Sequence, residues 1–231
     1  MANPLHELLD KLYADFNRWT GESRQKHPEI EIVWNKDLDR FRDAKEKFRI
    51  KWIVVGHNPG KKERGDRNEA GLWMGRYFHP EGSSGSWTRL VLAHDVRCLR
   101  DEVLFLEKTP ICSDDVEGLK KKKGKGDNPL FTEMLEGMAK AVHDLQEATE
   151  ASVWIQGYSD ACFEKFFQKL GDLYGATEAA KVRKKRVFKT PHIGNIIRSG
   201  NAFPVESLLE EGLAKALPEI EGFEWLAPES G

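Results

Sequence analysis

The apolar residues of this chain follow two patterns. Short apolar runs fit strands that are covered on both faces, whereas apolar residues spaced three and four apart mark one face of a helix. The runs predict four strands, at 52–55, 103–106, 152–156 and 186–189. Helical spacing predicts helices at about 5–19, 41–48, 87–92, 132–149, 159–170 and 205–217.

These elements predict one α/β domain over residues 1–231. Parallel pairing is expected because long helical connections join the strands, and a tight turn joins only antiparallel strands. We expect a three-layer α/β/α sandwich with a central four-stranded parallel sheet, preceded by an N-terminal helical extension over residues 1 to about 48. The length of 231 residues and the apolar content of 39% suffice for one substantial core.

The end of the first predicted strand is the most informative segment. After the apolar run 52–55, the chain continues as Gly56-His57-Asn58-Pro59-Gly60. Glycine and proline end a strand with a backbone that a ligand can approach closely, and α/β sheets bind ligands at such strand ends. Asn58 then has two interpretations from this segment alone, as a cap of the following turn or as a site residue.

This G-H-N-P-G segment resembles the first motif of the uracil-DNA glycosylase superfamily, in the G-x-N-P-G form of its mismatch-specific branch. Three later segments extend the resemblance: 76–80 with 86–90, which look like an aromatic-x-His-Pro segment and a Trp-bearing helix; 104–110, similar to the second strand and its polar exit; and 186–195, in the place of the last strand and its [His/Asn]-Pro-Ser motif. In this last segment His192 is followed by Ile-Gly-Asn, which departs from the motif.

The resemblance implies a monofunctional DNA glycosylase of base excision repair, which flips uracil or a related mismatched or damaged base and hydrolyses its N-glycosidic bond. Such a bond breaks with oxocarbenium character, so a water must be held beneath the anomeric carbon and the charge moving onto the base must be stabilised. Asn58 would hold the water through its amide oxygen, which is no base near neutral pH. His192 would donate to the base oxygen. The altered last motif leaves an alternative, a catalytically inactive member that binds nucleic acid or a nucleotide.

The resemblance also implies the surroundings of the base and of the DNA. The base would contact the main chain around His57, which includes Gly56, Pro59 and Gly60, and the side chain of Asn195 or His192 opposite. It would stack on Tyr77 or, as the close alternative, Phe78. One of these two aromatics would belong to the site and the other to the core. The DNA would contact Lys61, Lys62, Lys108, Thr109 and Arg198.

Charge adds one condition. The net charge of −2 provides no general attraction to nucleic acid, so binding would depend on basic clusters at 61–64, 120–125 and 183–186. We interpret 183–186 as a solvated face and expect the lysine-rich segment 120–125 to be a loop that orders on a polyanion. Basic clusters far from Asn58 would instead favour an unrelated α/β enzyme with a small phosphorylated substrate.

Cofactor and membrane signals are weak in this sequence. The three cysteines, Cys98, Cys112 and Cys162, are far apart, and the chain lacks C-x-x-C pairs, short His or Cys spacings and a phosphate-loop motif. We therefore expect no cofactor and no metal. With no signal-like start and no run of eighteen apolar residues, we expect a soluble, cytoplasmic protein that binds no membrane. The resemblance implies DNA containing uracil or a mismatched base as the partner, and we expect the protein to be a monomer.

Overall fold

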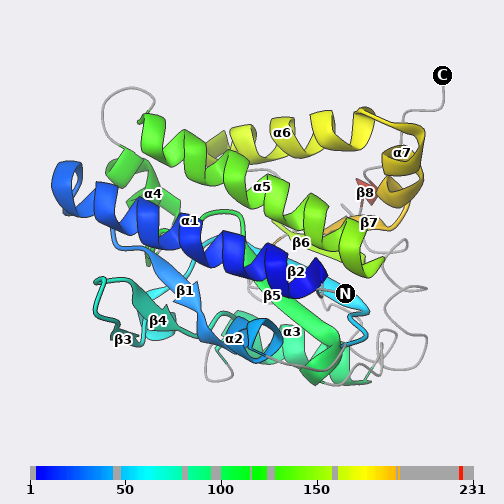
Figure 1. Ribbon diagram of the computed structural model, residues 1–231, viewed down its shortest axis with the longest axis horizontal. Helices are drawn as coiled ribbons and strands as arrows, with labels where there is room; N and C mark the ends of the chain where they lie inside the picture. Colours follow the sequence, from blue (N-terminus) through cyan, green and yellow to red (C-terminus); the bar gives the residue numbers. More distant parts are fainter. Residues whose placement is uncertain are drawn as a thin grey trace.

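Four parallel strands form the centre of the computed structural model (Figure 1). They are β2 (Trp52–Gly56), β5 (Val103–Glu107), β6 (Ser152–Gln156) and β7 (Val187–Thr190), in the order β5-β2-β6-β7. A short strand, β8 (Glu224–Trp225), pairs antiparallel with β7. All four predicted strands are confirmed, with bounds that differ by at most one residue.

The structure describes residues 4–43, 48–79, 83–94, 100–114, 116–123, 128–157, 161–190, 192 and 224–225. The expected helix at 205–217 and Cys98 lie outside these residues. So do Asn195 and Arg198. Among the described helices, none is long and apolar enough to cross a bilayer.

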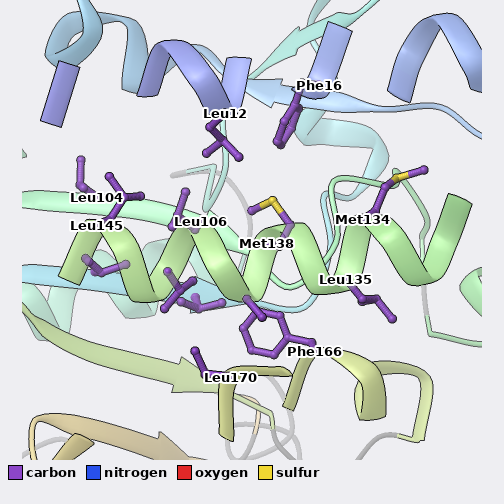
Figure 2. Close-up of a cluster of buried hydrophobic side chains, with 14 of the residues drawn as sticks. Leu12, Phe16, Leu104, Leu106, Met134, Leu135, Met138, Leu145, Phe166 and Leu170 are labelled. Carbon is purple, nitrogen blue, oxygen red and sulfur yellow. The ribbon is translucent and has the colours of Figure 1, made fainter. Parts of the chain in front are cut away.

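One face of the sheet is covered by α1 (Pro4–Lys26), α5 (Pro129–Thr149) and α6 (Glu164–Gly175). Leu12 and Phe16 of α1 lie on one side of α5, and Phe166 and Leu170 of α6 lie on the other (Figure 2). Leu104 and Leu106 of β5 belong to the same apolar cluster. This cluster is the main core of the protein.

The opposite face of the sheet carries the alternate residues of the same strands, because successive side chains of a strand point to opposite sides. Val54, Phe105, Trp154 and Phe188 form a second cluster there with Leu92 of α3 (Ser83–His94). Helices therefore lie on both faces of the parallel sheet, and the protein has an α/β fold, as the sequence predicts.

Local sequence explains the bounds of α5. Asn128 is the N-cap, because its side chain accepts a hydrogen bond from the Leu130 amide (3.0 Å). Pro129 follows in the first turn, where the fixed φ of proline suits the helix. The helix ends at Glu150 in the left-handed conformation (φ 55°). Its start lies three residues before the one predicted, because apolar spacing does not register the cap.

A second, small sheet consists of β1 (Val33–Asn35), β4 (Trp73–Gly75) and β3 (Asp66–Arg67), in the order β1-β4-β3. β1 pairs parallel with β4, and β3 pairs antiparallel with it. The segment before β2 is thus not purely helical, and its helix α1 packs in the main core rather than beside it.

The remaining helices are short. They are the 3-10 helices η1 (Lys36–Leu38), η2 (Lys61–Glu63), η3 (Arg100–Glu102) and η4 (Ala161–Phe163), and the α-helices α2 (Asp39–Arg42), α4 (Val116–Lys123) and α7 (Glu178–Lys184).

Two expectations about local structure are wrong. The helix expected at 41–48 is instead α2, which ends at Arg42, and Phe48 contacts Phe41 from outside the helix (ring centroids 4.9 Å apart). The lysine-rich segment 120–125, which we expected to be a loop, is helical from Lys120 to Lys123, where it forms the end of α4. Leu119, on the same helix, is fully buried and anchors it.

The packing of α6 gives a stability prediction. Phe166 is fully buried between α6 and α5, so Phe166→Ala removes its contacts and leaves a cavity. We expect the free energy of unfolding, measured in urea, to fall by about 3–5 kcal/mol. Val182→Ala is the control, since Val182 is 63% exposed and its loss should change this free energy by less than about 0.5 kcal/mol. Equal effects of the two changes would contradict the packing described here.

Candidate functional site

The carboxyl ends of the four parallel strands carry polar residues at one edge of the sheet. Gly56 pairs with Glu107, and Gln156 pairs with Thr190. These four residues end neighbouring strands and follow Val54, Phe105, Trp154 and Phe188 by two positions, so they point to the α3 face. Three of them, Glu107, Gln156 and Thr190, have polar side chains, and all three are buried. We call these three residues the polar row.

Asn58 follows this row and is held by main-chain acceptors. Its Nδ2 donates to the carbonyl oxygens of Ser113 (2.9 Å) and Pro59 (3.2 Å). Two carbonyl acceptors fix which end of the amide is nitrogen, so Oδ1 is left as an acceptor, and no described residue donates to it. Gly60, not Asn58, is the residue before η2, so Asn58 does not act as the cap of that turn.

Glu63 joins the Asn58 loop to the segment that follows β4. Its carboxylate accepts from the amides of Gly60 (2.9 Å) and His79 (3.1 Å). Burial raises the pKa of Glu63, and these amide donors oppose the rise. Glu63 was not predicted as a site residue from the sequence. The spacing Gly60-x-x-Glu63 is that of a capping box and could have indicated it.

The two aromatic candidates differ in their roles. Tyr77 is 1% exposed and its hydroxyl donates to the Val33 carbonyl (2.5 Å), so the expectation that it stacks on a base is wrong, because its ring and hydroxyl are both committed to the core. Phe78 has a left-handed backbone (φ 51°), which is strained for an aromatic residue, and stacks near Phe105 (5.1 Å). Arg89 holds this segment by donating hydrogen bonds to the carbonyl oxygens of Tyr77 (3.2 Å) and Phe78 (2.7 Å). Phe78 is also buried in the second apolar cluster, but it has no hydroxyl bonded to the core, so it is the aromatic that remains a candidate.

The structure brings the two predicted histidines together. The rings of His57 and His192 lie 4.6 Å apart, and His57 also stacks on Phe163 (5.0 Å). Burial, and then the charge of Lys108, lower the pKa of His57, so its ring is neutral at physiological pH. Its Nε2 lies 3.3 Å from the Gly157 carbonyl. Gly157 has φ 69°, and a Cβ there would collide with the His57 ring.

Lys108 has a different role from the one expected. It is fully buried, and its Nζ donates to the carbonyl oxygens of Gly56 (2.9 Å) and Gln156 (2.5 Å). Thr109 is also fully buried. The expectation that these residues border a DNA groove is therefore wrong, because neither side chain reaches the surface.

Two further polar residues were not foreseen. Glu107 is 3% exposed, and burial raises its pKa well above the ordinary value. Its carboxyl group lies over Gly56, where a Cβ would collide with it. Gln156 donates through Nε2 to Thr88 (2.9 Å). Neither Glu107 Oε2 nor Gln156 Oε1 has a hydrogen-bond partner in the described part of the chain. The sequence signal was a polar residue at the end of each apolar run.

The basic residues beside Asn58 are exposed, as expected for DNA contacts. Lys61 pairs with Asp114 (2.5 Å), and Lys62 is exposed in η2. Across the described residues, no three His, Cys, Asp or Glu side chains converge as metal ligands would.

Comparison with known proteins does not extend this description: no protein-family model matches the chain, and no curated protein matches its sequence. Fold and site together define a class only. This is an α/β protein with a polar site at the carboxyl ends of its parallel strands.

The buried acid predicts a pH dependence of stability. Burial keeps a proton on Glu107 in the folded state, so the folded protein binds more protons than the unfolded chain above the ordinary pKa of 4.5. The free energy of unfolding should therefore fall as pH rises from about 5, by up to about 1.4 kcal/mol per pH unit for one proton. In Glu107→Gln, which cannot ionise, we expect this fall to be shallower in urea titrations from about pH 5 to 8.

The control for this titration is Glu164→Gln, which changes an exposed glutamate of α6. It should leave the slope as in the wild type. If Glu107→Gln also leaves the slope unchanged, Glu107 is ionised in the folded protein and the assignment of a neutral acid is wrong.

Proposed function

We propose that this protein is a monofunctional DNA glycosylase with the uracil-DNA glycosylase fold, which hydrolyses the N-glycosidic bond of uracil or a related mismatched or damaged base. The observation that carries the proposal is the orientation of Asn58. Both of its amide hydrogens are directed to main-chain carbonyls, which leaves Oδ1 as a fixed acceptor for one water. The motif resemblance of 56–60 assigns that water as the nucleophile.

In the proposed reaction, Asn58 Oδ1 accepts a hydrogen bond from a water and holds it beneath the anomeric carbon of the flipped nucleotide. An amide oxygen cannot take the proton of this water as a carboxylate can, so Asn58 contributes position rather than basicity. The water adds as the bond to the base breaks, and its proton passes to the solvent. We expect slow turnover for this reason.

Stabilisation of the departing base is the second requirement, because negative charge moves onto a base oxygen as the bond breaks. His192 would donate a hydrogen bond to that oxygen. His57 stacks beside it (4.6 Å) and is neutral, so the pair does not repel. Glu107, in its neutral form, offers a second hydrogen-bond donor, an O–H group that lies at Gly56.

The base itself would stack on Phe78. A residue held in a left-handed conformation stores roughly 1–3 kcal/mol of strain, which Arg89 and Glu63 offset through the surrounding main chain. Base stacking on an aromatic ring contributes about 1–3 kcal/mol and is tolerant of base identity. The ring is 5% exposed, so the proposal includes a small opening of this segment when the base enters.

The proposal predicts that Asn58→Ala loses at least about 100-fold in the single-turnover rate of base release, because the water is no longer positioned. The measurement uses end-labelled duplexes with U·G, T·G, U·A or hypoxanthine pairs, and single-stranded uracil DNA, and scores alkali-labile sites. Binding of the duplexes should persist in the variant.

Asn17→Ala is the matched control, since Asn17 also donates its amide to a main-chain carbonyl (Tyr13, 3.0 Å), but within α1. It should excise at the wild-type rate. Full activity of Asn58→Ala would refute the role of Asn58. If wild-type protein binds the duplexes and cuts none of them, the protein is the catalytically inactive, nucleic-acid-binding member of the superfamily.

A further inference from the structure

Two pockets on the surface share one lining residue, and the first of them lies beside the Asn58 loop. The first has a volume of about 230 Å³ and is lined by Lys61 and by Lys121 and Lys122 of α4. The second has a volume of about 200 Å³ and is lined by Arg24 of α1 and Arg67 of β3. Glu31 lines both pockets and so lies between the two sets of cationic residues. We call the five cationic residues of the two pockets the basic band.

The charge of this surface is opposite to that of the whole protein. The five cations face two carboxylates, Glu31 and Asp114, which leaves a local charge of +3 on a chain whose net charge is −2. Such segregation of charge concentrates an attractive potential for a polyanion in one region.

The end of the band beside Asn58 has lysines that are available to bind an anion. Lys61 and Asp114 form an ion pair in which both side chains are more than half exposed, and such pairs contribute only about 0–1 kcal/mol. Lys61 can therefore exchange Asp114 for a phosphate at little cost. Lys121 is exposed and has no ion-pair partner among the residues that the structure describes. Lys122 lies deeper, where its Nζ donates to the Cys112 carbonyl (2.5 Å).

The far end of the band is held in place by an aromatic residue. The guanidinium carbon of Arg67 lies 4.2 Å from the centre of the Trp73 ring, and Arg64 lies at the same distance from it. Glu31 pairs with both arginines, at 2.8 Å from Arg64 and 3.7 Å from Arg67. Arg24 donates to the carbonyl of Ala70 (3.1 Å), which lies in the turn between β3 and β4. These contacts reduce the side-chain entropy that binding would otherwise cost.

Ser113 connects the basic band to the candidate site. Ser113 lines the first pocket, and its carbonyl accepts the hydrogen bond that orients Asn58 (2.9 Å). The amide of Ser113 in turn donates to the Pro59 carbonyl (2.9 Å). A nucleic-acid strand that lies along the band would therefore end at Asn58, the residue to which the water is assigned.

We propose that the basic band is a track for the phosphate backbone of a nucleic acid, which runs from Arg24 and Arg67, past Glu31, to Lys61 and Lys121 beside Asn58. The contacts are with phosphates, so the track is independent of sequence and of damage. The inference deepens the proposed function and rests on it for the identity of the polyanion. Base excision is not needed to test it.

The test is the salt dependence of binding to a short, undamaged, fluorescein-labelled DNA duplex, measured by fluorescence anisotropy on the full chain from about 50 to 200 mM salt. Each phosphate contact contributes about 0.9 to the slope of log K against log salt for a duplex, and about 0.7 for a single strand. We expect the double variants Lys61→Gln with Lys121→Gln, and Arg24→Gln with Arg67→Gln, each to reduce the duplex slope by about 1 to 2.

A charge-matched control comes from the other basic surface. Lys181→Gln with Lys185→Gln removes two exposed lysines at α7, which lies at the opposite end of the molecule from β3, β4 and α4 (Figure 1). This control should leave the slope unchanged. The proposal is overturned if all three double variants reduce the slope equally, if none does, or if only the pair beside Asn58 does.

Failure here is separable from failure of the glycosylase proposal. A reduced slope with no base release from any damaged duplex would keep the track and refute the enzyme. Base release with an unchanged slope would keep the enzyme and refute the track.

Discussion

The buried ammonium group of Lys108 is the interaction on which the site depends. Buried main-chain carbonyl oxygens at the ends of parallel strands need hydrogen-bond donors, and the Gly56 carbonyl already accepts one bond from the amide of Lys108 (3.2 Å). Lys108 crosses from β5 and donates to the last carbonyls of β2 and β6, at Gly56 and Gln156. Its ammonium also lies 4.9 Å from the centre of the Phe163 ring. A buried ammonium group is costly unless its hydrogen bonds are made, and a hydrogen bond to a charged group contributes about 1.5–3 kcal/mol. The three strand ends are therefore held in one fixed arrangement.

The remaining features of the site follow from this arrangement. With the Gly56 carbonyl fixed, the chain leaves β2 toward His57 and Asn58 in one direction. Burial lowers the pKa of His57, and the charge of Lys108 lowers this pKa further, so the ring is neutral. The side chain before Lys108, that of Glu107, then points to the opposite face and lies over Gly56. A Cβ at position 56 would occupy the space of this carboxyl group, so a larger residue there would displace the Glu107 side chain.

The sequence predicted the sheet well because buried parallel strands are short apolar runs with clear ends. It also predicted that Asn58, His57 and His192 lie at strand ends that meet. It did not predict β1, β3 or β4, since two or three residues carry no recognisable periodicity. It misplaced Lys108 and Tyr77 for another reason: their side chains are satisfied by main-chain carbonyls of distant elements, at Gly56, Gln156 and Val33, and such partners leave no local signal. Glu107 was overlooked for the same reason, since its environment is set by strand pairing.

Unfavourable features of the structure are concentrated at the same edge of the sheet. The left-handed backbone of Phe78 costs roughly 1–3 kcal/mol, and the two buried oxygens of Glu107 and Gln156 that have no partner among the described residues cost about as much each. Together these are a substantial part of the 5–15 kcal/mol by which domains of this kind are typically stable. Apolar residues at 107 and 156 would remove two of the three costs and would suit the strands. Because packing alone favours those replacements, the polar atoms are better explained by a ligand that completes their hydrogen bonds than by the needs of the fold.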